Sequence, residues 1–179
     1  RRRNQPLIDG SLIRRAFLWL GMIEASLGFI GFFVVYDAIS GAHHLSSLPA
    51  FVHNLLDLPG KVGVPTEYAY SLAITVYFVG VVMAQIGNAF ACRTEKHRGR
   101  ALGWLSNPSL LWGVFLEIVI AFALVYIPPL ARIFGHYPLP LVYWAGLALY
   151  APALYGLDWI RKSLVRRLSM KEEVKKDIP

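Results

Sequence analysis

The chain has 179 residues, of which 56% are hydrophobic and only 16% charged, and its mean hydropathy is +0.48. This composition is too apolar for an ordinary soluble domain and predicts an all-α membrane protein. The formal net charge of +7 would suit a nucleic-acid binder, but the basic residues are placed in a way that argues against nucleic acid as a partner.

Four apolar runs are long enough to cross a bilayer, which takes about 20 helical residues each. The runs are residues 16–36, 68–92, 110–127 and 139–160. The sequence therefore predicts a polytopic bundle of four transmembrane helices. We expect a single domain over residues 1–179, with a tail at 161–179.

The basic residues show which side of the membrane each loop occupies. Five of the 18 Lys and Arg residues precede the first span, four lie between the second and third, and seven follow the fourth. Only Lys61 and Arg132 lie on the other side. Because cytoplasmic loops carry the excess of Lys and Arg, we expect both termini to be cytoplasmic, with the chain in the plasma membrane and the lipid bilayer as a partner.

The first span contains a seam of small residues spaced three or four positions apart: Gly21, Ala25, Gly28 and Gly31. Such a seam lets a neighbouring helix approach closely. Glu24 lies on or near the seam, about 12 Å along the helix from the start of the span. We favour a structural role for this carboxyl group, with a place in an ion path as the alternative.

A long loop on the outside of the membrane is expected from Asp37 to Glu67, because its glycines and prolines exclude one continuous helix. Three histidines in it, His43, His44 and His53, invite a metal site. Adjacent histidines point in different directions and no carboxylate or cysteine completes a ligand spacing, so we expect solvated loop residues and no metal site here. The apolar centre of the loop leaves open a regulator that acts at the membrane surface.

The second span carries two amides, Gln85 and Asn88, and ends at Cys92. The amides lie about one helical turn apart, so both carbonyl oxygens can face the same neighbour. A buried amide in lipid needs a partner, and the two interpretations are an interhelical hydrogen bond and a cation. Cys92 is the lone cysteine, forms no intrachain disulfide, and is expected to be structural.

The third span places Glu117 among apolar residues, about 10 Å from the cytoplasmic side and at the same depth as Gln85. An ionisable group at mid-membrane costs about 2.5–3.5 kcal/mol, so a layer of polar groups indicates a function such as ion handling. Carboxylate and amide oxygens are the ligands that hard cations prefer. Three such ligands are too few to hold a dehydrated cation, and a protonated structural carboxyl remains the alternative for Glu117.

The fourth span contains Pro152, which predicts a kink, and ends with a structural i,i+3 ion pair of Asp158 and Arg161. The mixed charges of the tail predict an amphipathic helix that frays toward Pro179. The sequence has no phosphate-binding loop, no metalloprotease motif and no nucleophile elbow, so no catalytic activity is expected of this chain alone.

Five runs of sequence resemble the C-terminal membrane region of type II P-type cation-transporting ATPases. In chain order they are RRRNQPLIDGSLIRRAFLWLGMIEA, AQIGNAFACRTEKH, WGVFLEIVIAFALVYIP, GHYPLP and LDWIRKSLVRR. The resemblance implies the seventh to tenth helices of a ten-helix pump, with cation-liganding positions at Gln85 and Asn88 and an acidic ion-site position at Glu117. Sodium pumps have an aspartate where Asn88 stands, and calcium pumps an acid where Gln85 stands, so sodium, potassium, calcium and protons all remain candidate cations. Glu24 inherits no role.

The family's phosphorylated aspartate, its nucleotide-binding domain and its fourth to sixth helices have no counterpart in this sequence, which begins without methionine. The resemblance therefore implies a piece of a longer pump, whose other helices and domains are its partners. ATP and Mg²⁺ are expected in the full-length pump and no cofactor in this chain. The predicted function is to scaffold the transport helices and complete a cation site. The alternative is a self-standing four-helix membrane scaffold or a small oligomeric transporter.

Overall fold

The computed structural model describes residues 15–40, 66–93, 103 and 105–176. In chain order the helices are η1 (Arg15–Gly21), α2 (Met22–Ser40), α4 (Thr66–Ala91), α5 (Pro108–Tyr126), α6 (Pro128–Phe134), α7 (Leu141–Leu147) and α8 (Tyr150–Lys176). The η1 segment is a π-helical turn that leads directly into α2. No strand occurs in these ranges, so the predicted all-α class is confirmed for the described part of the chain.

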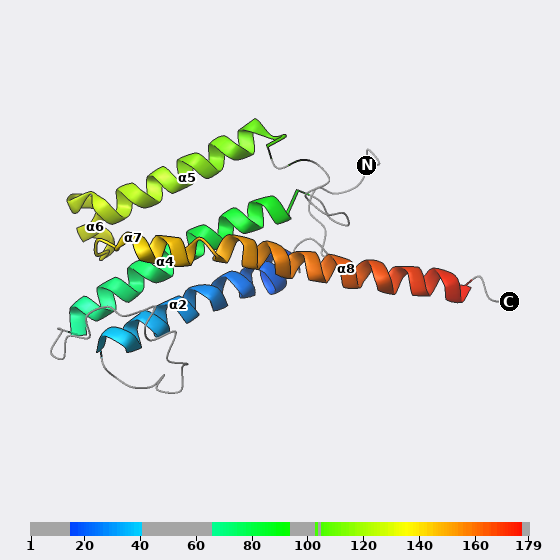
Figure 1. Cartoon of the computed structure of the whole chain (residues 1–179), viewed down its shortest axis with the longest axis horizontal. Coiled ribbons are helices and arrows are strands. Elements are labelled where there is room, and N and C mark those ends of the chain that lie inside the picture. The colour runs from blue at the N-terminus through cyan, green and yellow to red at the C-terminus, as the bar shows by residue number, and fades with distance from the viewer. Residues whose placement is uncertain (1–14, 41–65, 94–102, 104, 177–179) are drawn as a thin grey trace.

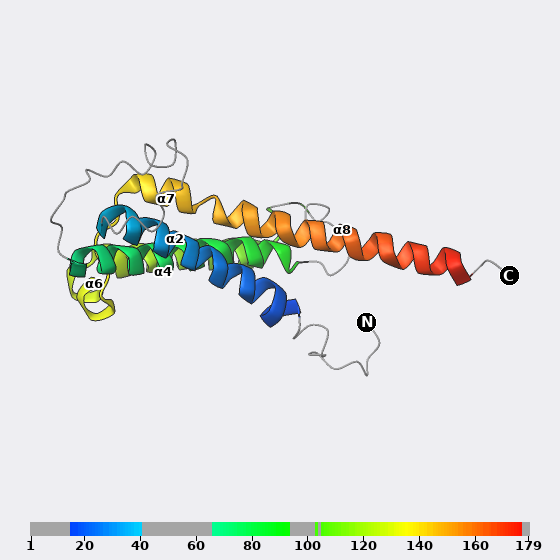
Figure 2. The same ribbon diagram turned by 90° about the horizontal axis from the view of Figure 1, so that it is seen from below.

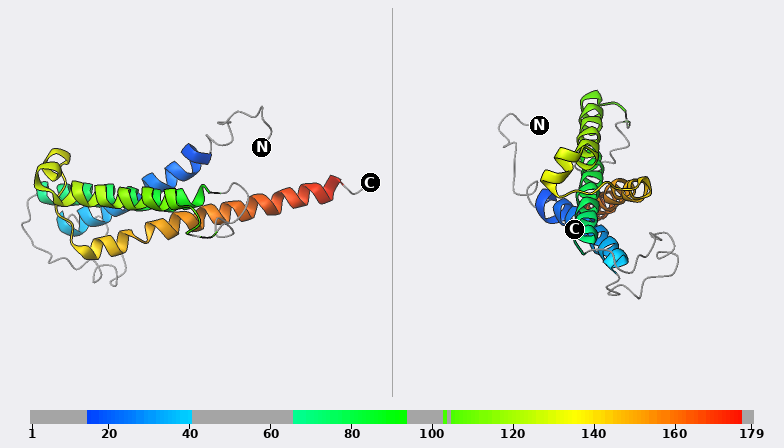
Figure 3. Two further views of the ribbon diagram at one scale, coloured as in Figure 1. Left: turned by 90° about the horizontal axis from the view of Figure 1, so that it is seen from above. Right: turned by 90° about the vertical axis from the view of Figure 1, so that its left-hand side faces the viewer.

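The central helix is α4, against which α2 and α8 pack closely while α5 runs along another side (Figure 1). Viewed end-on, α5 stands away from α2 and α8 (Figure 3). Helices α2, α4 and α5 alternate in direction, so the last turn of α4 lies at the same end of the bundle as the first turns of α2 and α5. We call this end the Ala91 end and the opposite one the Thr66 end. Helix α8 extends well past the Ala91 end (Figure 2).

Three helical segments are long and apolar enough to cross a membrane: Leu18–Ser40, Thr66–Ala91 and Pro108–Tyr126. The first three predicted spans are thus confirmed as helices of the required length and hydropathy, and the chain is an integral membrane protein. The first helix continues to Ser40 and the second begins at Thr66. The expected outside loop is therefore shorter than predicted, because Asp37 belongs to α2 and Glu67 to α4.

Other predictions fall on residues for which no structure is described. The histidines of the expected outside loop, at positions 43, 44 and 53, lie outside the described residues, as does most of the predicted cytoplasmic loop at 94–102. The tail is helical as predicted, since α8 runs without interruption to Lys176.

The fourth predicted span, residues 139–160, is wrong as a single membrane helix. Helix α7 ends at Leu147 and α8 begins at Tyr150, and among the described helices only the three named above meet the length and hydropathy of a span. The bundle therefore has three candidate spans, followed by a broken helical segment that lies along α4 (Figure 2).

The break between α7 and α8 is caused by Pro152, which lies four residues after Ala148. Pro152 has no N–H with which to bond the Ala148 carbonyl, and its ring crowds that carbonyl. The chain turns more tightly instead, with Leu149 N donating to Gly146 O at 3.2 Å, an i to i−3 bond. The sequence predicted a kink at Pro152, whereas the structure has a full interruption one turn earlier.

Prolines also determine both ends of α5. Asn107 precedes Pro108 and caps the helix, because its side chain accepts a hydrogen bond from Leu110 N at 3.2 Å. The helix ends at Tyr126, two residues before Pro128, which starts the short helix α6. Helix α6 was not predicted, since it lies between the third and fourth apolar runs, at 110–127 and 139–160.

Glycines set the helix separations around α4. A Cβ atom at Gly28 would lie 2.9 Å from the ring of Tyr77, which confirms that the small-residue seam of the first span receives a neighbouring helix closely. The tightest approach is between α4 and α8, where a Cβ at Gly87 would lie 2.3 Å from the carbonyl oxygen of Ala151. These helices therefore touch backbone to backbone.

The buried apolar side chains form two clusters along the bundle. The Thr66-end cluster joins α2, α4, α5 and α7, and its members are Val35, Leu72, Val76, Val79, Val82, Met83, Ala121, Val125, Leu139, Tyr143, Trp144 and Leu147. The Ala91-end cluster joins η1, α4 and α8 through Leu20, Ala84, Ala91 and Leu154. Tyr150, the first residue after the break, packs against both clusters. No residue of α5 belongs to the Ala91-end cluster as described.

Candidate functional site

Asn88 links α4 to α2. Its Nδ2 donates a hydrogen bond to Glu24 Oε1 at 2.8 Å, and its Oδ1 accepts one from Cys92 Sγ at 3.1 Å. Both polar ends of the amide are thus satisfied by protein groups, and the contact with α2 is an interhelical hydrogen bond of the kind that stabilises membrane helix pairs. A cation at Asn88 would have to compete with the thiol for the amide oxygen.

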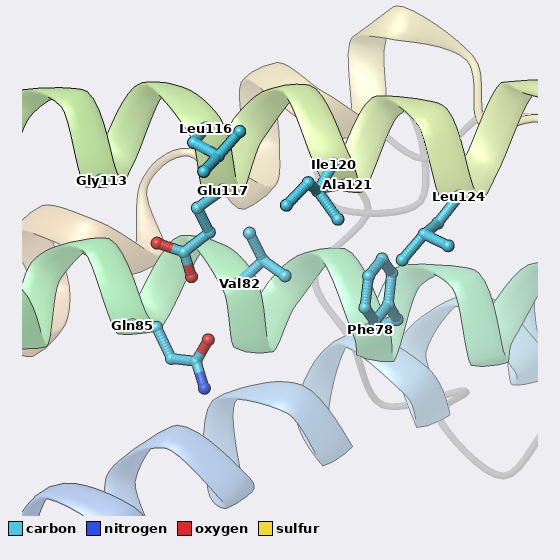
Figure 4. Close-up of a pocket in the computed structure, with 9 residues that line it drawn as sticks. All are labelled: Phe78, Val82, Gln85, Gly113, Leu116, Glu117, Ile120, Ala121 and Leu124. Carbon is cyan, nitrogen blue, oxygen red and sulfur yellow. The ribbon is translucent and has the colours of Figure 1, made fainter.

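Gln85 and Glu117 line one pocket of about 340 Å³ between α4 and α5. The lining residues are Phe78, Val82, Gln85, Gly113, Leu116, Glu117, Ile120, Ala121 and Leu124. Figure 4 shows the Glu117 carboxylate directed across the gap toward α4, while the Gln85 amide lies on the α2 side of the α4 ribbon in this view. Within the described part of the chain neither side chain is hydrogen-bonded. The rest of the wall is apolar.

The two amides of α4 thus have different contacts, although their spacing suggested a shared neighbour: Asn88 bonds Glu24 of α2, whereas Gln85 lines the pocket that α4 shares with α5. Three residues correspond to about 300° of helical rotation, which leaves Gln85 and Asn88 about 60° apart. On a helix that other helices contact on several sides, this angle is enough for Asn88 to bond α2 and for Gln85 to line the pocket toward α5. The equal depth predicted for Gln85 and Glu117 does bring these two residues to one place.

Residues 1–164 match the family described as "Cation transporting ATPase, C-terminus". The chain belongs to this family.

The relatives of this cation ATPase C-terminal domain include sodium/potassium-transporting ATPase subunits of animals. It is 28% identical over 174 residues to the sodium/potassium-transporting ATPase subunit alpha-4 of Rattus norvegicus, and the matched region covers 92% of this chain and 17% of that protein. It is 28% identical over 178 residues to the subunit alpha of Drosophila melanogaster, with 92% and 16% covered. It is 27% identical over 176 residues to the subunit alpha-3 of Gallus gallus, with 92% and 17% covered. The chain spans about a sixth of the length of these relatives.

The cation ATPase C-terminal domain also holds a buried charge cluster at the Ala91 end. Arg161 Nε lies 2.9 Å from Asp158 Oδ1, which is the predicted i,i+3 pair. Lys162 adds a second ion pair, with Nζ 2.8 Å from Asp158 Oδ2, and also donates to the carbonyl oxygen of Ala91 at 2.6 Å. Lys162 and Asp158 are 3% and 0% exposed, so the pair is removed from solvent. A cation at the last carbonyls of α4 is favourable because it opposes the negative end of the helix dipole.

Lys162 was missed by the sequence interpretation, although its position four residues after Asp158 is a recognised spacing for an ion pair. The pairing joins α8 to the end of α4 and works together with the close approach at Gly87.

At the Thr66 end, an aromatic group ties α5 to α7. The ring of Trp144 stacks on Phe122 with centroids 4.0 Å apart, and its Nε1 donates to the Tyr126 hydroxyl at 3.0 Å. That hydroxyl in turn donates to the carbonyl oxygen of Leu139. Aromatic residues with a polar tip are common where helices reach a membrane interface, and here they fix the end of the third span.

The segment between α6 and α7 is fastened to α4. Tyr137 N donates to Thr75 Oγ1 at 2.9 Å, and Thr75 is fully buried. The ring of His136 stacks on Phe78 with centroids 4.6 Å apart, and its Nδ1 lies 3.3 Å from the Leu124 carbonyl oxygen. Burial lowers the pKa of His136, and the contact with the Leu124 carbonyl opposes that shift only in part. The described residues contain no group of three His, Cys, Asp or Glu side chains placed to hold a metal ion.

Proposed function

We propose that the chain is the C-terminal membrane part of an ATP-driven cation pump, in which it supports the transport helices and supplies part of a cation site. In this proposal α2, α4 and α5 take the places of the seventh, eighth and ninth pump helices, and the broken α7–α8 segment takes that of the tenth. The family membership and the similarity to sodium/potassium-transporting ATPase subunits support this assignment. The distribution of Lys and Arg supports a cytoplasmic Ala91 end, and the plasma membrane is the location that we propose.

The observation that carries the cation site is the orientation of Glu117. Its carboxylate is directed into a pocket whose walls are otherwise almost entirely apolar (Figure 4). A carboxyl group is costly at this depth, and an oxygen ligand for a cation or proton is a function that offsets the cost. Gln85 lies on the opposite wall and has enough rotatable bonds to turn its amide oxygen toward Glu117.

The Glu24 and Asn88 pair occupies a second position on the α2 side of α4. Because Asn88 holds Glu24 by a hydrogen bond, we infer that this pair fixes a carboxyl group close to the transport path rather than supplying two free ligands. In this proposal Asn88 contributes to the cation site indirectly, by holding the Glu24 carboxyl group in place.

The site is incomplete within this chain, because these residues offer too few oxygens for a dehydrated cation. The window that makes α5 a candidate span is only 11% buried, against 56% for α4, so most of the α5 surface is left for lipid or for further pump helices. We propose that those helices supply the remaining ligands, and that ATP and Mg²⁺ bind to parts of the pump outside this chain. The experiment described next also tests whether sodium, potassium, calcium or protons are carried.

The test is the cation dependence of ATP hydrolysis by the full-length protein. Glu117→Gln removes the charge with little change in shape, and Gln85→Ala removes the amide. Each should raise the half-activating cation concentration by about tenfold, which corresponds to about 1.4 kcal/mol of lost binding. Leu116→Ala is the matched control, because Leu116 lines the same pocket without an oxygen ligand. An unchanged cation dependence in both variants would reduce these residues to a structural role.

A further inference from the structure

Helix α5 is held firmly along only part of its length. Ala121 and Val125 belong to the Thr66-end cluster, and the aromatic contacts of Trp144 fix the same half of the helix. The half that starts at Pro108 contributes no described residue to either cluster. Glu117 lies one turn from Ala121, at the boundary between the anchored half and the half without core contacts.

At the Ala91 end, one side chain connects α4 to the start of α5. The Arg93 guanidinium donates from Nη1 to the Gly103 carbonyl oxygen at 2.7 Å and from Nη2 to Ser106 Oγ at 2.6 Å. Ser106 Oγ also donates to Gly103 O at 3.0 Å, which closes a small ring of hydrogen bonds. Asn107, which follows directly, is the N-cap of α5. Arg93 thus holds the residues that begin the helix.

We propose that Arg93 is a positioning residue, a strap that sets the separation between α4 and the first half of α5 and thereby limits access to the pocket of Glu117. That this pocket takes a cation rests on the proposed function. That Arg93 controls its opening rests on the geometry alone.

The chemistry of arginine suits this task. A planar guanidinium offers several donors in a fixed fork, so it binds two acceptors at once and restrains direction as well as distance. A lysine at the same position offers a single charged nitrogen and would restrain the start of α5 less well. Because few other contacts hold this half of α5, the effect of the strap on the pocket is expected to be large compared with its effect on overall stability.

The test measures how fast a charged thiol reagent reaches the pocket. Gly113 lines the pocket, and a Cβ there would meet no atom within 4 Å, so Gly113→Cys is sterically tolerated. The full-length protein would carry Cys92→Ser, which removes the chain's own thiol near Arg93, and labelling at position 113 would be followed by peptide mass spectrometry in unsealed membranes. Because the reagent is charged, its rate of reaction reports water access to the pocket.

In that background Arg93→Ala should speed labelling at position 113 by about fivefold, the factor that one lost net contact represents. Arg93→Lys and Ser106→Ala should give smaller increases, since each retains part of the connection. Arg167→Ala is the matched control, because Arg167 is an exposed arginine five residues beyond Lys162 on α8 and should leave the rate unchanged.

Equal labelling rates in the parent and in Arg93→Ala, whether fast, slow or undetectable, overturn the proposal. An equal increase in Arg167→Ala overturns it as well, because the effect would then follow from lost charge alone. The outcome is independent of the cation assignment: a failure of Glu117→Gln to alter cation dependence removes the proposed ion site and leaves the labelling result to decide on the strap.

Discussion

Asn88 on α4 and Glu24 on α2 are joined by a 2.8 Å hydrogen bond between residues 64 positions apart in the chain. The amide donates and the carboxyl group accepts, so a neutral acceptor of the same shape can replace the carboxyl group as far as the bond is concerned. This separates the structural role of Glu24 from any role of its charge.

Glu24→Gln should therefore preserve thermal stability in detergent, because glutamine Oε1 can still accept from Asn88. Glu24→Ala should lower the free energy of unfolding by about 1 kcal/mol, the typical size of an interhelical hydrogen bond in membranes. In a double-mutant cycle with Asn88→Ala the two losses should not add. Full additivity would show that the bond contributes nothing to stability.

The close approach of α4 and α8 predicts a sharp difference between two glycines. Gly87→Ala places a methyl group 2.3 Å from the Ala151 carbonyl oxygen, a backbone atom that cannot rotate away. We expect a loss of about 1–3 kcal/mol, as for other overpacked sites. Gly113→Ala, where the added carbon meets nothing within 4 Å, is the control and should be neutral or stabilising. Equal thermal midpoints for the two variants would contradict the described helix separation.

Because the ion pair at the Ala91 end is buried, we expect that removing one of its two charges destabilises the chain more than removing both. Lys162→Met removes one of the two cations that pair with the buried Asp158 carboxylate, and we expect a loss of about 3 kcal/mol. The double variant Asp158→Asn with Lys162→Met removes both charges and should recover part of that loss. The measurement is unfolding in detergent. A double variant less stable than Lys162→Met would argue that the charges are needed for more than their mutual neutralisation.

His136 predicts a pH dependence of stability. Burial lowers the pKa of His136 in the folded chain below the ordinary value of 6.5, so the unfolded chain binds a proton at a higher pH than the folded chain does. The stabilisation is therefore complete above pH 6.5 and is lost as the pH falls through the folded pKa. His136→Phe keeps the stacking on Phe78 and should flatten this part of the stability profile. An unchanged slope in that variant would assign the pH dependence to other groups.

The sequence predicts those parts of the fold that depend on hydrophobic length and on local spacing. Three spans, the small-residue seam at Gly28 and the Asp158–Arg161 pair follow from rules that act within one helix. The fourth span was wrong because its apolar content is continuous, whereas its backbone is interrupted where Pro152 deprives Ala148 of a donor. Hydropathy counts side chains and takes no account of main-chain hydrogen bonds.

The candidate site, too, could be predicted from the sequence only in part. Gln85 and Glu117 were correctly predicted to lie together, because each is the same number of residues from the expected cytoplasmic end of its helix. Distances along a helix axis do not show which way a side chain turns, so they did not predict the hydrogen bond from Asn88 to Glu24. The sequence did not predict that Arg93 connects α4 to α5. No sequence pattern places its acceptors, Gly103 and Ser106, next to it.

Tyr150 has a consequence for the unfolding of the whole chain. It is the one described residue outside the two clusters that packs against both, with its ring 3.0 Å from where a Cβ at Gly80 would lie and its hydroxyl oxygen 2.9 Å from one at Gly31. Melting of either end must therefore disturb the same aromatic ring, and its ultraviolet absorbance should change once, in a single cooperative step, even though the helical segment is broken between α7 and α8, just before this residue.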